Sequence, residues 1–411
     1  MWPHKVILPS LLLSSGLPAV SAQHCTTDRP LRERQKFPRS PVHRITYNNI
    51  GGEGSFNEVV GMGANGECQT RQKSFRGPLA PLDEDPSTRE KLSLHFRGPL
   101  HLKEFAVYNT SRIKKRDTVS NPEKQKADQI TVERTDTVVA TINGQVVSWR
   151  DNWFGPQSTR PVSVGSVKWT TSTSPASTPS HQPAPLGGEW RRVAYYSAER
   201  RTAQNVVFLG NYGGQGSGLF DNVWGNSLSY LNADGNGGSS SAQILKDVSI
   251  PSNTEFSIFS AERCGNSCGF SRARDVAYKG FEGANKIFLF HFKMPLDGDR
   301  GFNGDMPALW ALNGRIPRTA QYNSCSCWTT GCGEVDIFEA LAKGDRKCIS
   351  AFHLTKFAQS PNWFDRPVDR YVKVAVMFFG ASSSVVITKL PYETEFSDDL
   401  KDSLVESWSG N

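Results

Sequence analysis

The amino-acid sequence predicts an all-β protein built around a two-sheet sandwich. Short runs rich in Val, Ile and Phe recur from Trp190 onward, separated by Gly, Pro and Asn turns. Helical periodicity is almost absent from this half, and the chain contains 36 Gly, 24 Pro and 23 Phe. About 220 residues of short strands at this spacing are typical of a β-sandwich.

Residues 1–22 have the pattern of a secretory signal peptide. A basic start ends at Lys5, residues 6–20 are mostly apolar, and Val20-Ser21-Ala22 offers small residues at a cleavage site. That run is too short to cross a bilayer, and no later stretch approaches about 18 uninterrupted apolar residues. We therefore expect a secreted, extracellular or cell-wall protein that begins at Gln23 and has no membrane span.

Residues 23–112 are expected to form a small, Gly-rich β domain. Its strands are expected at 44–47, 92–96 and 105–108, where apolar and polar residues alternate. Because Gly and Pro interrupt regular strands, turns are expected at Gly51-Gly52, Arg76-Gly77-Pro78 and Arg97-Gly98-Pro99.

Residues 113–188 are expected to be a disordered linker. From Gln157 the chain is rich in Ser, Thr and Pro, and such a segment cannot bury enough apolar surface to order itself. Lys114-Lys115-Arg116 offers a dibasic site for proteolytic processing, although a solvated charge run explains it equally well. An isolated hairpin is expected over residues 138–149, around Asn143-Gly144.

Residues 189–411 carry the strands of the predicted sandwich. These are expected at 193–196, 205–209, 228–231, 255–260, 286–293, 334–339, 349–354, 372–379 and 385–390.

The net charge of +7 does not indicate a nucleic-acid partner. The basic runs lie at 29–39 and 112–116, in polar segments that are typical of solvated chain, and no nucleic-acid-binding motif accompanies them. A basic protein could still be retained electrostatically by an acidic extracellular matrix.

The eight cysteines are expected to form disulfides, because oxidised pairs are usual in secreted proteins. Cys264 and Cys268 have a spacing that zinc sites also use, but the Cys325-Ser326-Cys327 spacing is awkward for a metal. The sequence does not select a pairing. We expect the bridges to brace loops around a cleft.

Residues 334–339 have the sequence Glu-Val-Asp-Ile-Phe-Glu, which places three carboxylates among residues that favour a half-buried strand. In a regular strand Glu334 and Asp336 share one face and Glu339 lies on the other. One extra residue in a β-bulge would return Glu339 to the shared face. Two carboxyl groups roughly 5–5.5 Å apart are what retaining glycosidases use. A chance cluster of surface acids is the competing interpretation, but it would not need the apolar residues in between.

The residues around this stretch resemble glycoside hydrolase family 16. The resemblance rests on residues 285–295, on 305–312 with its Pro-Ala-x-Trp element, on 333–339 and on 349–353. More closely, the whole chain resembles the target-of-SBF-like glycosyl hydrolases of fungal cell walls, which join a Gly-rich N-terminal domain to a family 16-like domain. That match rests on residues 77–82, 95–100, 205–218 and 325–328.

The resemblance implies a concanavalin-like β-jelly-roll with an open groove and endo-action on β-1,3- or mixed-linked glucan. It implies that Glu334 is the nucleophile, Glu339 the acid/base and Asp336 an orienting group in a retaining reaction. Trp310 would stack on a sugar and His353 would lie beside the groove, although both residue types are often simple core residues. The Cys-rich insertions beside the motif are unusual and could narrow or cap the groove.

This chemistry needs neither a metal nor an organic cofactor. The expected partner is cell-wall β-glucan, and the sequence leaves the oligomeric state open. Two further interpretations stay open: a transglycosylase that passes the sugar to another glucan, and a structural, glucan-binding wall protein without activity.

Overall fold

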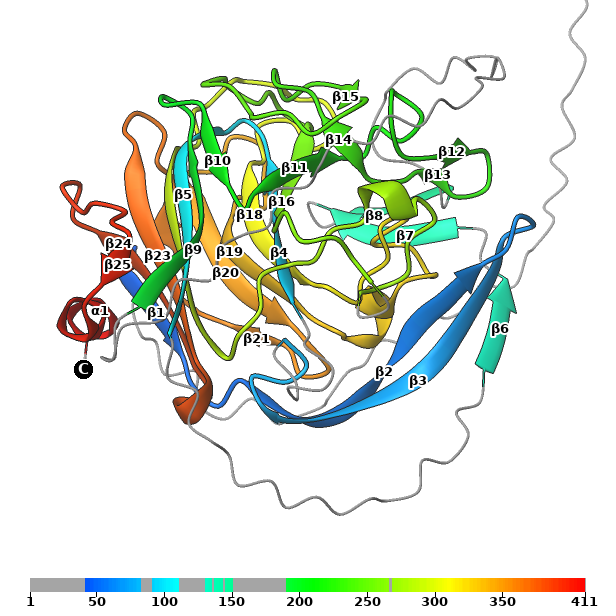
Figure 1. Cartoon of the computed structure of the whole chain (residues 1–411), viewed down its shortest axis with the longest axis horizontal. Helices are drawn as coiled ribbons and strands as arrows, with labels where there is room; N and C mark the ends of the chain where they lie inside the picture. Colours follow the sequence, from blue (N-terminus) through cyan, green and yellow to red (C-terminus); the bar gives the residue numbers. More distant parts are fainter. Residues whose placement is uncertain are drawn as a thin grey trace, which may run out of the picture. The chain divides into compact units, whose positions relative to one another are not determined.

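Two antiparallel β-sheets pack face to face around a shared apolar core (Figure 1). The computed structural model describes residues 41–82, 91–110, 190–265 and 268–410, and the backbone alone of 130–134, 137–142 and 145–150. All of these belong to one compact unit, Arg39–Asn411. The expected signal peptide and the dibasic site lie outside the described residues, as does most of the expected linker. The predicted all-β, sandwich-like class is confirmed.

The first sheet has eight strands. Its order is β1 (Arg44–Tyr47), β24 (Ser384–Leu390), β23 (Val372–Phe379), β17 (Asn285–Lys293), β5 (His101–Thr110), β9 (Trp190–Ser197) and β10 (Thr202–Gln204), with β25 (Asp399–Leu400) also paired to β9.

The second sheet has ten strands and carries the candidate site. Its order is β15 (Gly238–Ser239), β14 (Ser229–Leu231), β11 (Val207–Gly210), β16 (Glu255–Phe259), β4 (Leu92–Arg97), β18 (Ala308–Asn313), β19 (Glu334–Glu339), β20 (Lys347–His353) and β21 (Ala358–Gln359), with β22 (Phe364–Asp365) paired to β20.

Smaller elements complete the described chain. They are the pair β12 (Phe220–Asp221) and β13 (Gly225–Asn226), the sheet of β2 (Gly51–Met62), β3 (Glu67–Pro78) and β6 (Ile130–Arg134), the hairpin of β7 (Thr137–Ile142) and β8 (Gln145–Arg150), the helix α1 (Asp402–Ser409), and the 3-10 turns Arg274–Val276, Cys327–Thr330 and Gly380–Ser382. The β7–β8 pairing confirms the hairpin expected around Asn143-Gly144.

None of the helices in the described part is both long enough and apolar enough to cross a membrane.

Successive side chains of a strand point to opposite faces of its sheet, and the apolar ones on the inner faces pack the two sheets together. On β17, Phe288, Phe290 and Phe292 point into the core between the sheets and are fully buried. Ile287 and Leu289, which alternate with these residues, pack on the opposite face in a separate cluster that includes side chains of α1. Burying a Phe side chain contributes about 1.5–3 kcal/mol, so this one strand stabilises both faces of its sheet.

Strands from the N-terminal part lie inside the sandwich. β4 pairs with β16 on one side and β18 on the other, and β5 lies between β17 and β9. This differs from the expected separate domain over residues 23–112, because the strands 44–47, 92–97 and 101–110 find their hydrogen-bond partners in residues 190–390. Alternation identifies a strand locally but does not say which strand it will join.

The hairpin of β2 and β3 was not predicted from the sequence. Gly51-Gly52 and Gly77-Pro78 were expected as turns, but they pair with each other at the open end of the hairpin. That prediction is wrong because Gly and Pro at a strand end can still join a ladder. Phe56 and Phe75 supply the apolar contacts that pack the hairpin against the second sheet.

Six of the cysteines form disulfides, as expected. The bridges are Cys68–Cys325, Cys264–Cys268 and Cys327–Cys332. Cys348 departs from the prediction: it is a free, buried thiol whose pKa burial raises to about 12. Its place on β20 inside the core gives it no neighbouring cysteine within bonding distance among the described residues. Cys25 lies outside them.

Candidate active site

The three carboxylates of β19 lie on one face because the strand contains a bulge. Leu309 of β18 is opposite Phe338, whereas the next residue, Trp310, is opposite Asp336, so Ile337 is the additional residue. Ile337 and Phe338 both pack in the core between the sheets, as Val335 does. The carboxylates therefore project from the other face. This confirms the bulge that the Glu-x-Asp-x-x-Glu spacing predicted.

Glu334 is buried, with 7% of its surface exposed. Its Oε2 accepts a hydrogen bond from the indole nitrogen of Trp328 at 2.6 Å. Burial raises the pKa of Glu334 well above its usual value, and the charge of Asp336 raises it further. The Trp328 hydrogen bond and the nearby His353 act in the opposite direction. The Glu334 carboxyl group is therefore costly to ionise, but the Trp328 N–H is in place to stabilise its charged form.

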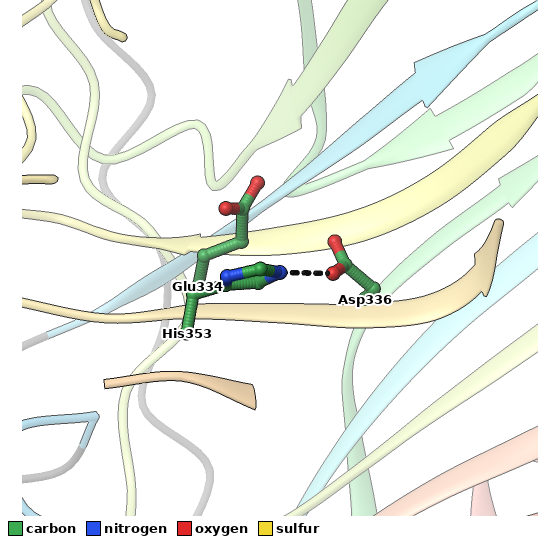
Figure 2. Close-up of side chains that lie close together, drawn as sticks. All are labelled: Glu334, Asp336 and His353. Atoms are coloured by element: carbon green, nitrogen blue, oxygen red, sulfur yellow. Dashed lines mark hydrogen bonds and ion pairs between the residues drawn. The ribbon is translucent and has the colours of Figure 1, made fainter. Parts of the chain in front are cut away.

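Asp336 and His353 form the second contact of the site. His353 lies opposite Glu334 in the register of β20 and β19, and its Nε2 is 2.8 Å from Asp336 Oδ2 (Figure 2). Burial and then the charge of Glu339 raise the pKa of Asp336 well above its usual value, whereas Arg97 lowers it. The structure therefore brings His353 to the carboxylates, as the sequence led us to expect.

A small cation would also fit the spacing of Glu334, Asp336 and His353, since one ligand atom from each lies within 4.8 Å of the others. However, Asp336 and His353 are already bonded to each other, and Glu334 is bonded to Trp328. We therefore treat them as members of two hydrogen-bonded pairs, Asp336 with His353 and Glu334 with Trp328.

Arg97 joins Glu339 to a fourth acid. Its Nη2 lies 3.4 Å from Glu339 Oε1 and its Nη1 lies 3.7 Å from Glu255 Oε1. Burial raises the pKa of Glu255, and Arg97 opposes that shift. Neither Arg97 nor Glu255 was predicted from the sequence. Arg97 alternates with the core residue Phe96, which puts it on the site face, but only the pairing of β4 with β16 and β18 shows that it lies beside β19.

Trp310 lies beside Asp336 on the same face of the sheet, because the two residues are opposite each other in β18 and β19. Its ring stacks on His95 with centroids 5.5 Å apart, and its indole nitrogen donates to the Tyr322 hydroxyl at 2.6 Å. Only 5% of Trp310 is exposed, so the ring has no open face for a sugar in this structure. His95 is itself fixed by hydroxyl groups at both ring nitrogens, and burial lowers its pKa to about 3.

Residues 314–333, between β18 and β19, cover this part of the face. They supply Tyr322 and Trp328, whose rings meet edge to face at 5.6 Å. Phe56 and Phe75 of the β2–β3 hairpin pack in the same cluster. The Cys-rich insertion thus caps the carboxylates, which was one of the arrangements expected from the sequence, and the hairpin adds a second wall that was not expected.

One ionic contact and one disulfide fasten the hairpin beside the site, and a second ionic contact lies within the hairpin itself. Glu58 of β2 is buried and accepts from Arg315 at 2.7 Å and from Arg71 at 2.9 Å. The Cys68–Cys325 bridge joins the hairpin to the insertion covalently. Because a buried carboxylate with two partners is costly to separate from them, the wall is held firmly.

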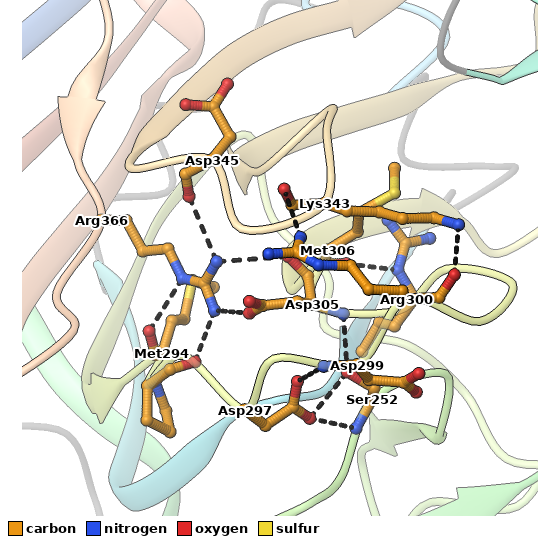
Figure 3. Close-up of polar contacts among 12 residues, drawn as sticks. Ser252, Met294, Asp297, Asp299, Arg300, Asp305, Met306, Lys343, Asp345 and Arg366 are labelled. Carbon is orange, nitrogen blue, oxygen red and sulfur yellow. Dashed lines mark hydrogen bonds and ion pairs between the residues drawn. The ribbon is translucent and has the colours of Figure 1, made fainter.

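The loop leading into β18 is held by a buried arginine. Arg366 pairs with Asp305 at 2.6 Å and donates to the carbonyls of Met294 and Asp345 (Figure 3). This network fixes the chain just before Pro307-Ala308, so Trp310 and its neighbours enter the sheet in a defined register.

Comparison with known proteins gives consistent matches. The family model described as cell wall protein YJL171C/Tos1, C-terminal, matches residues 188–408, and its N-terminal counterpart matches residues 43–110. These two segments correspond to the two halves whose strands share the sandwich. No solved structure matches the chain.

Several fungal relatives are similar over most of their length. A Candida albicans protein named probable circularly permuted 1,3-beta-glucanase TOS1 is 37% identical, over 90% of this chain and 91% of its own. A Saccharomyces cerevisiae protein of the same name is 36% identical, over 89% of each chain. An Arthroderma benhamiae protein named probable circularly permuted 1,3-beta-glucanase is 36% identical, over 85% of each chain. The chain therefore belongs to the cell wall protein YJL171C/Tos1 family.

Proposed function

We propose that this protein is a β-glucan-active glycosidase of the cell wall, with its active site on β19. The observation that carries the proposal is the bulge at Ile337, which gathers Glu334, Asp336 and Glu339 on one face. Retaining glycosidases need such a carboxylate pair beside the scissile bond. The names of the fungal relatives support a glucanase, and the match to a cell-wall family supports that location.

The reaction we propose is a double displacement with retained configuration. Glu334 forms a bond to the anomeric carbon while Glu339 gives a proton to the departing glycosidic oxygen. Water or an acceptor hydroxyl then attacks that carbon, Glu339 takes the proton, and the bond to Glu334 breaks. Asp336, bonded to His353, is the orienting group between them.

The finer assignments are endo-action on β-1,3-linked glucan and secretion directed by residues 1–22. The first is supported by the resemblance to glycoside hydrolase family 16 and by the names of the relatives. The second is supported by the apolar run and the Val20-Ser21-Ala22 sequence.

A second candidate is a wall protein that binds glucan without cleaving it. Burial favours this candidate, since Glu334 and Asp336 are 7% and 5% exposed beneath Trp328 and its neighbours. A glucan chain would have to displace part of this cover before its anomeric carbon could reach Glu334.

The deciding experiment incubates the full chain with β-1,3-gluco-oligosaccharides and follows both reducing ends and product length. We expect shorter products from the unmutated protein, and losses of about 10²–10⁴-fold in Glu334→Gln and Glu339→Gln. Products longer than the substrate would indicate transfer to another glucan. The matched control is Glu393→Gln, at an exposed acid outside the site. Binding of the oligosaccharide with no turnover by the unmutated protein would reject the enzyme and favour the second candidate.

A further inference from the structure

Trp328 contacts the Glu334 carboxylate from outside the strand that carries it. Its indole nitrogen donates to Glu334 Oε2 at 2.6 Å, and it lies in the 3-10 turn before β19. Because few solvent molecules reach a buried carboxylate, one donor strongly influences where its oxygens point. We propose that Trp328 is a positioning residue for Glu334 and that the Cys327–Cys332 disulfide holds Trp328 in place. This inference rests on the proposed function.

The loop that carries Trp328 is held by hydrogen bonds and a disulfide between its own residues. The side chain of Ser326 accepts the Trp328 backbone N–H at 3.2 Å at the start of the turn. The Cys332 N–H donates to the Cys327 carbonyl at 3.1 Å, across the pair of residues that the disulfide joins. Gly331 ends the turn with φ at 83°, a conformation that favours glycine. These contacts fix the backbone of the turn from which the indole ring extends.

Contacts from neighbouring segments hold the same loop. The Asn57 N–H, on β2, donates to Thr330 Oγ1 at 2.9 Å, so the hairpin supports the turn. The ring of Tyr322 meets the indole at 5.6 Å. The position of Trp328 is therefore set by contacts within its own insertion and by β2, which is far away in the sequence.

The contact leaves a defined oxygen for chemistry. Trp328 binds Oε2, which makes Oε1 the atom of Glu334 that attacks the anomeric carbon in the proposed reaction. The titratable groups that face Glu334 are Asp336 and Glu339 on β19, His353 on β20 and the hydroxyl of Tyr322. Burial and the acids raise the pKa of Glu334, whereas Trp328 and His353 lower it.

Loss of the indole donor should have two consequences. The Glu334 carboxylate becomes harder to ionise, and its oxygens are free to rotate. Both reduce the fraction of protein in which Glu334 can act as a nucleophile, and the first does so in a pH-dependent way.

The first test compares the full chain with Trp328→Phe, which keeps an aromatic ring and removes the N–H donor. We expect kcat/KM on β-1,3-gluco-oligosaccharides to fall about tenfold or more, the loss typical of one hydrogen bond to a charged group. The acid limb of the pH profile should move to higher pH. The control is Trp363→Phe, whose ring lies by Lys347, and it should leave both unchanged. A fall in activity with an unmoved pH profile would reduce Trp328 to a structural residue and overturn the proposal.

A carbon-13 NMR titration tests the contact without relying on turnover. The Glu334 carboxyl signal is identified by its loss in Glu334→Gln, and it should titrate at higher pH in Trp328→Phe than in the unmutated protein. An unchanged midpoint overturns the proposal whether or not the protein is active. An inactive protein with a shifted midpoint would reject only the proposed function.

The disulfide is tested by removing both of its cysteines. Cys327→Ser/Cys332→Ser should reproduce the pH shift of Trp328→Phe, with thermal unfolding recorded to confirm that the variant is folded. The matched control is Cys264→Ser/Cys268→Ser, because it removes an equally local bridge that lies beside the turn Arg274–Val276. If both double variants keep the unmutated pH profile and Glu334 titration, the bridge does not position Trp328.

Discussion

Glu334 and Asp336 occupy places that are unfavourable for a charge. Both are nearly inaccessible to solvent, and burial raises the pKa of both. The charge of Asp336 raises the pKa of Glu334 further, and the charge of Glu339 raises that of Asp336. Trp328 and His353 each supply one polar contact, which offsets part of the cost. Perturbed ionisation of this kind is common at functional sites, because the burial that destabilises a carboxylate also makes it reactive.

The raised pKa of Glu334 should make the stability of the folded protein depend on pH. Burial raises the folded-state pKa of Glu334 above its unfolded value of about 4.3. The stability contributed by its bound proton is therefore full below about pH 4 and is lost as the pH rises through the folded pKa. Glu334→Gln removes that loss, so the variant should match the unmutated protein near pH 4 and be more stable near pH 7, by on the order of 1 kcal/mol.

Thermal unfolding over a series of pH values measures this difference. Glu393→Gln, at an exposed position, serves as the control and should follow the unmutated protein at every pH. A stability gap between Glu334→Gln and the unmutated protein that stays constant with pH would contradict the prediction.

Among the secondary-structure elements, β19 contains one additional residue that changes which side chains point to each face of the sheet. Its bulge lets Ile337 and Phe338 both enter the core while the acids on either side keep the outer face. Without Ile337, the remaining order of Asp336, Phe338 and Glu339 would alternate as a regular strand does. The bulge is therefore an addition to a site that a regular strand could also present.

We predict that the strand tolerates deletion of Ile337 better than deletion of Val335. Deleting Ile337 removes one buried side chain, at a cost of about 2–5 kcal/mol, but leaves every carboxylate on its face. Deleting Val335 turns the Asp336 carboxyl group toward the apolar core, where an unpaired charge is far more costly. Soluble yield and the unfolding midpoint would be compared for the two variants. Equal loss of folded protein would argue against this account of the bulge.

Across the molecule as a whole, two distant parts of the chain share one core. β4 and β5 each have a strand from residues 190–390 on both sides, and Cys68–Cys325 links the same two parts covalently. The piece 189–411 alone would leave five strands, β16, β18, β17, β9 and β24, with an unpaired edge each. Such edges expose unpaired backbone N–H and C=O groups, which promote aggregation by pairing with other chains.

We therefore predict that a cut between residues 113 and 188 leaves the two parts together. With a protease site introduced at Lys114-Lys115-Arg116, the cleaved protein should elute as one species in gel filtration. On denaturing gels it should run as one band without reductant and as two bands with it. The same cut in Cys68→Ser should give two bands without reductant but still one species in gel filtration. Separation of the parts under native conditions would contradict the shared core.

Local patterns were sufficient to predict many features of this protein. Alternation with period two identified most strands of the second half, and the spacing of Glu334, Asp336 and Glu339 implied the bulge. Both properties depend on residues within a few positions of one another. The pairing of six cysteines as disulfides also followed from chemistry, although their partners did not.

Other features depended on contacts between residues far apart in sequence. The places of β4 and β5, the Arg97 contacts to Glu255 and Glu339, and the Trp328 contact to Glu334 all required the folded chain. Among the residues that the structure describes, Cys348 is a buried cysteine without a disulfide partner. Strand pairing is decided by which edges and apolar faces fit together in three dimensions, and a pattern of period two is the same for every candidate partner.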